Sequence, residues 1–127
     1  MLFRSSSHVY LSLNGGTSWT NIGTGLPDIP HNTIVFDPTN RDVIYVGNDQ
    51  GVYYAQAVPL SGNIGTSYNV NWTSYNEGLG DGVLVSDIVI TNTRKLRLAT
   101  YGRGLWERDM ITPTPQTSFS KIGRAHV

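Results

Sequence analysis

Short apolar runs, many of them β-branched or aromatic, alternate along the chain with stretches rich in Gly, Asn, Ser and Thr. Such runs are typical of half-buried β-strands, and no segment keeps the apolar period of a helix over about ten residues. The pattern therefore predicts an all-β protein. The predicted strands cover residues 8–13, 18–22, 33–37, 42–47, 51–56, 71–75, 86–91, 95–100 and 104–108.

Parts of the sequence recur at a fixed distance. Segment 19–26 returns as segment 72–79, with Trp-Thr at the start and Gly-Leu at the end of both, an offset of 53 residues. Segment 43–53 matches segment 96–106 at the same offset of 53. In the second pair Gly51 aligns with Gly104, and Tyr53 aligns with Trp106. Two independent matches at one offset indicate a repeated structural unit that buries its faces against its neighbours.

A looser match, at an offset of 54, sets residues 34–37 against 88–91. The period is slightly longer than an ordinary repeat of four short strands needs, and we assign the excess to the Gly-, Ser- and Asn-rich loop 57–70. On this interpretation two predicted strands belong to one repeat unit, four to the next and three to the last.

One predicted hairpin carries a motif. Asn14-Gly15 joins the first two strands, and both residues tolerate the positive φ of a tight turn. The segment Ser12-Leu13-Asn14-Gly15-Gly16-Thr17-Ser18-Trp19 resembles the Asp-box, Ser-x-Asp-x-Gly-x-Thr-Trp, with Asn14 in place of Asp and Ser18 in place of Thr. The resemblance implies that Asn14 caps amides of its own turn and that Trp19 packs between blades. The structural Asp-box residues would be Ser12, Asn14, Gly16, Ser18 and Trp19.

Segments 45–53 and 99–107 resemble strand pairs of bacterial Asp-box (BNR-repeat) propellers, and the second resembles their closing blade. That family includes xyloglucanase-like glycoside hydrolases, sialidase-like proteins and sortilin-like propellers. The resemblance covers residues 9–110 and implies a partial β-propeller of about two four-stranded antiparallel blades. It is specific for fold and weak for activity, because a fold does not fix a function.

The sequence after residue 110 differs in character. We expect the propeller portion to be 1–110, followed by a linker at 111–120, where alternating prolines disfavour a central strand. Pro115 to Ser120 resembles the opening of a PKD-type β-sandwich. Residues 121–127 resemble a translated sequencing-adapter read-through and are expected to be non-native, the alternative being an ordinary disordered terminus. We expect 112–127 to make few contacts with the strands and the last blade to lack its fourth strand.

Composition excludes several partners. The formal net charge is +0 and no basic stripe is present, so we expect no binding to nucleic acid or to a membrane surface. The chain has no cysteine and its three histidines lack ligand spacing, so neither a metal site nor a cofactor is expected. Residues 1–7 lack the apolar core of a signal peptide. The resemblance implies an extracellular or cell-surface bacterial protein, whose targeting signal would then lie upstream.

Candidate chemistry is sparse. Glycoside hydrolysis needs two carboxyl groups flanking the scissile bond, and most carboxylates here lie in predicted turns, so we assign no catalytic residue. Asp49 is a candidate ligand contact, the alternative being turn capping. Arg103 is the second candidate, the alternative being binding to carbonyls or stacking on Trp106. The aromatic residues Trp72, Trp106 and Tyr53 could stack on sugar rings, but their repeated positions favour a core between blades.

The sequence thus favours a structural or ligand-binding propeller segment of a larger exported bacterial protein, without catalysis by the segment itself. Its partners would be the remaining blades of the same chain, with carbohydrate as a candidate ligand. The alternative is part of a xyloglucanase- or sialidase-like glycoside hydrolase whose catalytic residues lie mostly elsewhere. A third interpretation is an accessory domain of an adhesin or peptidase. Because end blades present apolar faces, the isolated chain is predicted to be marginally stable and to self-associate.

Overall fold

The computed structural model describes residues 2–4, 8–12, 14–39, 43–56, 71–80, 82–111 and 118–123. Within these ranges all regular structure is β, in eleven strands and with no helix, which confirms the predicted all-β class. The strands are β1 (Leu2–Arg4), β2 (Val9–Leu11), β3 (Thr20–Asn21), β4 (His31–Phe36), β5 (Ile44–Asn48), β6 (Gly51–Ala55), β7 (Trp72–Ser74), β8 (Val85–Ile90), β9 (Lys95–Thr100), β10 (Gly104–Asp109) and β11 (Ser120–Gly123).

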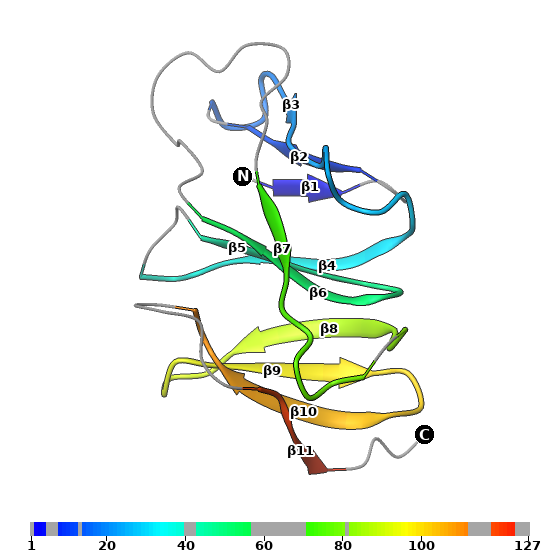
Figure 1. The fold of residues 1–127 in the computed structure, drawn as a ribbon. Coiled ribbons are helices and arrows are strands. Elements are labelled where there is room, and N and C mark those ends of the chain that lie inside the picture. Colours follow the sequence, from blue (N-terminus) through cyan, green and yellow to red (C-terminus); the bar gives the residue numbers. More distant parts are fainter. Residues whose placement is uncertain are drawn as a thin grey trace.

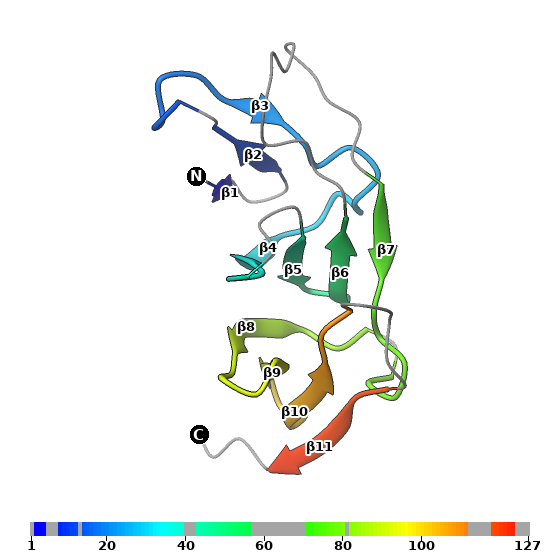
Figure 2. The same ribbon diagram turned by 90° about the vertical axis from the view of Figure 1, so that its left-hand side faces the viewer.

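The strands form three antiparallel sheets stacked face to face (Figure 1). The first sheet has the order β1-β2-β3, the second β4-β5-β6-β7, and the third β8-β9-β10-β11. Figure 2 shows the first strands of the sheets along one side of the stack and the last strands along the other. The fold is therefore a partial β-propeller of two four-stranded antiparallel blades, with a three-stranded blade before them.

A shared irregularity fixes how the second and third sheets correspond. The β4–β5 pairing shifts register between His31 and Thr33, and the β8–β9 pairing shifts between Val85 and Asp87. A β-bulge is a specific local feature, so its recurrence sets β4 against β8 at an offset of 54. The looser sequence match was thus in the correct register.

The offset then changes along the blade, because the connecting loops differ in length. Phe36 pairs with Ile44, but Ile90 pairs with Leu96 across a shorter loop. The strands β5 and β9 therefore correspond at an offset of 52, so the predicted offset of 53 is wrong for this strand pair. The β9–β10 hairpin is one residue longer than the β5–β6 hairpin, which restores an offset of 53 and sets Tyr53 against Trp106.

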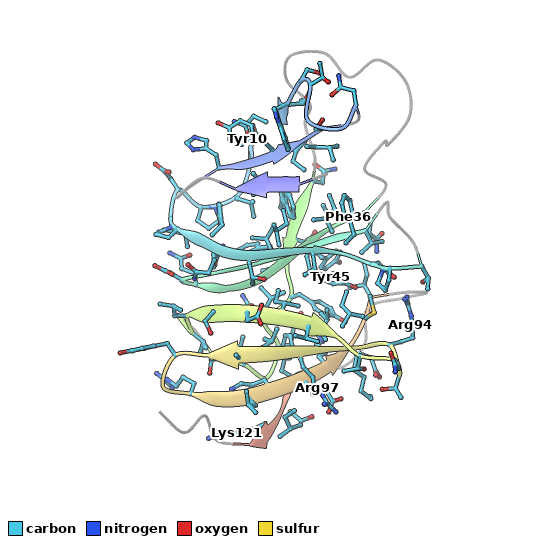
Figure 3. The ribbon with its side chains drawn as sticks, turned by 180° about the vertical axis from the view of Figure 1, so that it is seen from behind. Tyr10, Phe36, Tyr45, Arg94, Arg97 and Lys121 are labelled. Carbon is cyan, nitrogen blue, oxygen red and sulfur yellow. The ribbon has the colours of Figure 1, made fainter. Side chains whose placement is uncertain are left out.

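Two apolar cores hold the stack together, because the second sheet buries side chains against both of its neighbours. The smaller core lies between the first and second sheets and contains Val9, Leu11, Ile22, Ile44, Val46 and Ala55. The larger core lies between the second and third sheets and contains Val43, Tyr45, Val52, Tyr75, Leu79, Val83, Val85, Ile88, Leu96, Leu98, Met110, Ile111 and Phe119. Figure 3 shows Tyr45 lying between these two sheets, where its side chain is fully buried.

Two strands, β1 and β11, are not among those predicted from the sequence. β1 gives the first blade a third strand, paired with β2. β11 pairs with β10 and completes the third blade. The prediction that residues 112–127 make few contacts with the strands is therefore wrong for 118–123, where Phe119 is buried in the larger core. Of the predicted linker at 111–120, residues 112–117 lie outside the described residues, whereas Ile111 and Phe119 are buried in the larger core and Ser120 begins β11.

Candidate functional site

The hairpin between β2 and β3, which carries the segment that resembles an Asp-box, is held by its own side chains. The Gly16 N–H donates to Ser12 Oγ at 2.8 Å, and the Ser12 hydroxyl donates to Asn14 Oδ1 at 3.0 Å. Asn14 Oδ1 also accepts the Ser18 N–H at 2.9 Å, and Asn14 Nδ2 donates to Ser18 Oγ at 2.8 Å. The prediction that Asn14 caps an amide of its own turn is confirmed.

Trp19 and Trp72 lie at corresponding positions, immediately before β3 and at the start of β7. Trp72 packs against the smaller core, and its indole N–H donates to the Ile22 carbonyl at 2.8 Å. This contact joins the first and second sheets. Trp19 lies beside Gly16 and keeps 38% of its surface exposed, because no described sheet precedes the first one.

The turns that follow β3 and β7 repeat the same hydrogen bonds. The N–H of Ile22 donates to Val9 O at 2.9 Å, and the N–H of Tyr75 donates to Val52 O at 2.8 Å. Four residues later, Leu26 N–H donates to the carbonyl of residue 23 at 3.0 Å, and Leu79 N–H to that of residue 76 at 2.8 Å. The segments 19–26 and 72–79 therefore correspond residue by residue, as the sequence match predicts.

Asp49 lies in the β5–β6 hairpin and takes part in a link between sheets. Its carboxylate accepts a hydrogen bond from Asn32 Nδ2 at 3.0 Å, and the same amide donates to the Val85 carbonyl at 3.0 Å. The carboxylate thus orients Asn32 across the gap between the second and third sheets. This contact gives Asp49 a structural role in addition to any contact with a ligand.

Arg103 lies in the β9–β10 hairpin, which corresponds to the hairpin of Asp49 in the preceding sheet. Its carbonyl accepts the indole N–H of Trp106 at 3.0 Å, and its side chain is exposed. Within the described residues no hydrogen bond or ion pair joins Arg103 to Asp49. The two candidate ligand contacts therefore occupy equivalent turns without forming one site.

The carboxylates of the described residues are mostly engaged in ion pairs. Asp37 binds Arg94 through both oxygens, at 2.6 and 2.8 Å. Burial alone would raise the pKa of Asp37, but the hydrogen bonds from Arg94 and Thr39 outweigh it and lower the pKa to about 2. The hydrogen bond from Arg108 likewise lowers the pKa of Glu77. A glycosidase acid needs a raised pKa, so neither carboxyl is suited to that role.

Arg108 was missed as a site residue. Its guanidinium carbon lies 3.5 Å from the centre of the Tyr75 ring and 5.5 Å from that of Phe119, and it donates to Glu77 at 2.9 Å. The cation is thus held between aromatic rings of the second and third sheets. Side chains alternate between the two faces of β10, so the sequence places Arg108 on the same face as Trp106. The contact of Arg108 with Phe119 is not predicted, because Phe119 lies outside the repeated segments.

An open polar cavity of about 340 Å³ lies at the edge of the first sheet. It is lined by His8, Asn21, Gly23, Thr24, Gly25, Leu26 and Asp28. No pattern in the sequence points to this cavity, because most of its lining residues are small or polar and carry no motif. A second hollow, of about 240 Å³, lies on the outer face of the third sheet and includes the exposed Val89 and Leu105.

The described residues contain no group of three His, Cys, Asp or Glu side chains that could hold a metal ion. No helix among them meets the length and apolarity of a membrane span. Comparison with protein-family models, curated proteins and solved structures finds no match for this chain.

Proposed function

We propose that this chain is a segment of an Asp-box (BNR) repeat propeller within a larger exported bacterial protein. Its role is to dock onto neighbouring blades and to carry ligand-contacting turns, and the segment itself does not catalyse a reaction. The remaining blades of the same chain are its partners, and carbohydrate is a candidate ligand at the turns of Asp49 and Arg103.

The observation that carries this proposal is the repeated way in which one sheet docks on the preceding one. Trp72 of the second sheet packs with Ile22 of the first, and Phe119 of the third sheet packs edge-on to Tyr75 of the second, with ring centres 6.0 Å apart. Ile22 and Tyr75 correspond in the repeat. The same type of contact used twice is what a modular stack of blades requires.

A pair of tryptophan variants tests this modular docking. Trp72→Ala removes the ring and the indole hydrogen bond between sheets, so we expect a loss of about 2–4 kcal/mol in the free energy of unfolding. Trp19→Ala is the matched control at the corresponding position, and we expect a loss below about 1 kcal/mol because no described sheet covers it. Denaturant unfolding of both variants measures the difference. Equal losses would contradict docking through Trp72.

The glycoside hydrolase alternative needs a facing pair of carboxyl groups with opposed pKa shifts. Asp37 and Glu77, whose pKa values are both lowered, are each bound to an arginine. This supports the non-catalytic proposal over the hydrolase for the segment itself. Release of nitrophenol from a panel of nitrophenyl glycosides by the purified chain would overturn the proposal.

A further inference from the structure

Asn14 and Gly15 form a sequence step that is prone to deamidation, in which the asparagine side chain loses ammonia and becomes a carboxylate. Both residues are exposed in the hairpin between β2 and β3. Gly15 has no side chain to shield its amide nitrogen, and apart from its chain neighbours nothing lies within 4 Å of the point that a Cβ would occupy. Asn14-Gly15 is the single Asn-Gly step in the sequence, so rapid deamidation is expected here before any other place.

The reaction needs water as its only co-reactant. The Gly15 nitrogen loses its proton and attacks Asn14 Cγ, so that a C–N bond forms. The side-chain nitrogen Nδ2 takes up a proton and leaves as ammonia, which gives a five-membered succinimide. Water then adds to one of the two ring carbonyls and opens the ring to aspartate or to isoaspartate.

In the folded hairpin three hydrogen bonds hold the Asn14 carboxamide. Its Oδ1 accepts the Ser12 hydroxyl at 3.0 Å and the Ser18 N–H at 2.9 Å, and its Nδ2 donates to Ser18 Oγ at 2.8 Å. Cyclisation requires the carboxamide to turn toward residue 15 and Nδ2 to depart, which breaks these bonds. Because each bond is worth up to about tenfold in an equilibrium constant, the closed hairpin opposes the reaction.

We propose that Asn14 is a deamidation site whose conversion is gated by opening of this hairpin. The closed turn keeps Asn14 as the amide, and the succinimide forms when local opening frees the carboxamide. The aspartate product closes again into the same turn, because a carboxylate accepts the Ser12 hydroxyl and the Ser18 N–H as the amide oxygen does. The Ser18 hydroxyl, which accepts from Nδ2, turns and donates to the second carboxylate oxygen.

The conversion has two consequences for the first sheet. It puts at position 14 the aspartate that the Asp-box pattern has there, and it adds a negative charge to a chain whose formal net charge is +0. The isoaspartate product instead lengthens the backbone inside the turn that the Gly16 N–H closes onto Ser12 Oγ. This inference does not rest on the proposed function, since it concerns the chemistry of one hairpin.

Peptide mapping by mass spectrometry measures the conversion of Asn14 over time at mildly alkaline pH, where the Gly15 nitrogen loses its proton more readily. We expect Asn14 to convert at least about tenfold more slowly in the folded chain than in concentrated urea. Circular dichroism of the same samples verifies that the chain is folded in one and unfolded in the other. Equal rates in the two samples would overturn the proposal.

A serine variant tests the gate itself. Ser18→Ala removes the acceptor of the Nδ2–H but keeps the backbone N–H, so conversion in the folded chain is expected to rise several-fold. Ser86→Ala is the matched control, because its hydroxyl donates to the Ala99 carbonyl in the third sheet, and it is expected to convert at the parent rate. Asn14→Asp is expected to melt within a few degrees of the parent chain. A Ser18→Ala rate no higher than that of Ser86→Ala, or a clear loss of stability in Asn14→Asp, would contradict the gated site.

Discussion

Phe119 occupies in the third sheet the position that Trp72 occupies in the second. Trp72 pairs with Ala55, and the pairing of Glu107 with Ser120 sets Phe119 opposite Arg108, the residue that corresponds to Ala55. Both rings pack on the turn of the preceding sheet, Trp72 with Ile22 and Phe119 with Tyr75. A docking aromatic at the start of the last strand is therefore common to both interfaces between sheets.

Replacing Phe119 tests this correspondence. Phe119 is 4% exposed, so Phe119→Ala is expected to lower the free energy of unfolding by about 3–5 kcal/mol. Phe119→Trp places the side chain of the second sheet at the same position and is expected to cost about 1–3 kcal/mol, because it enlarges a buried side chain, but less than Phe119→Ala. Urea unfolding compares the two variants. A Trp variant as unstable as the Ala variant would show that the two positions are not interchangeable.

Truncation separates the contribution of Phe119 from that of the strand that follows it. A chain ending at Ser120 keeps the buried ring but loses the pairing of Lys121 and Gly123 with β10. A chain ending at Ile111 loses both. We expect the longer truncation to be clearly less stable in thermal unfolding, by several degrees, because burial of the ring dominates. Equal melting temperatures would mean that Phe119 is not docked in solution.

The ion pair between the buried Asp37 and the partly exposed Arg94 gives a pH-dependent prediction. The side chain of Asp37 is 0% exposed and that of Arg94 is 37% exposed, so solvent weakens the pair. We expect Asp37→Asn to cost about 1–3 kcal/mol at neutral pH. The folded pKa of Asp37 is about 2, below its ordinary value of 3.8. The stability from this charge is therefore complete above pH 4 and is lost as the pH falls toward 2.

Urea unfolding of the parent chain and of Asp37→Asn across this range measures the effect. The difference in unfolding free energy between the two proteins should shrink as the pH falls from about 4 to about 2. Arg97, which pairs with Glu107 at 3.5 Å and has a side chain that is 55% exposed, supplies a control. Arg97→Gln is expected to change stability by less than about 1 kcal/mol. A pH-independent cost of Asp37→Asn would contradict the lowered pKa.

Much of the fold could be predicted, because local signals and the repeat agree. Asn14-Gly15 specifies its hairpin through turn chemistry alone, and Gly51 and Gly104 mark corresponding strands. Neither turn residues nor the repeat marks the strands β1 and β11. Residues 2–4 are too few to show an alternation, and β11 follows a proline-rich stretch and overlaps the adapter-like residues 121–127.

The site residues that could be predicted are likewise those whose contacts are local in sequence. The hydrogen bonds of Ser12 and Asn14 in the Asp-box-like hairpin join residues close in sequence, so the motif predicts them. The aromatic enclosure of Arg108 joins residues far apart in the chain, as does the link from Asp49 through Asn32 to Val85.

The outer face of the third sheet exposes apolar side chains, as expected if these sheets are blades of a longer stack. Val89 corresponds to Val35, which packs against the larger core, yet Val89 is 54% exposed. Leu105 on the same face is 38% exposed. Among the described residues no fourth sheet covers this face, so it offers an apolar surface to a second copy of the chain.

Sedimentation velocity of the purified chain, beside Val89→Lys and the control Tyr101→Lys, tests this account most directly. Tyr101 is 79% exposed and lies in the β9–β10 hairpin, away from the sheet face. We predict that the parent chain and Tyr101→Lys self-associate at micromolar concentration, and that Val89→Lys is shifted to monomer without loss of thermal stability. A monomeric parent chain with a sharp, cooperative unfolding transition at high temperature would contradict the account, because it would show a self-sufficient domain.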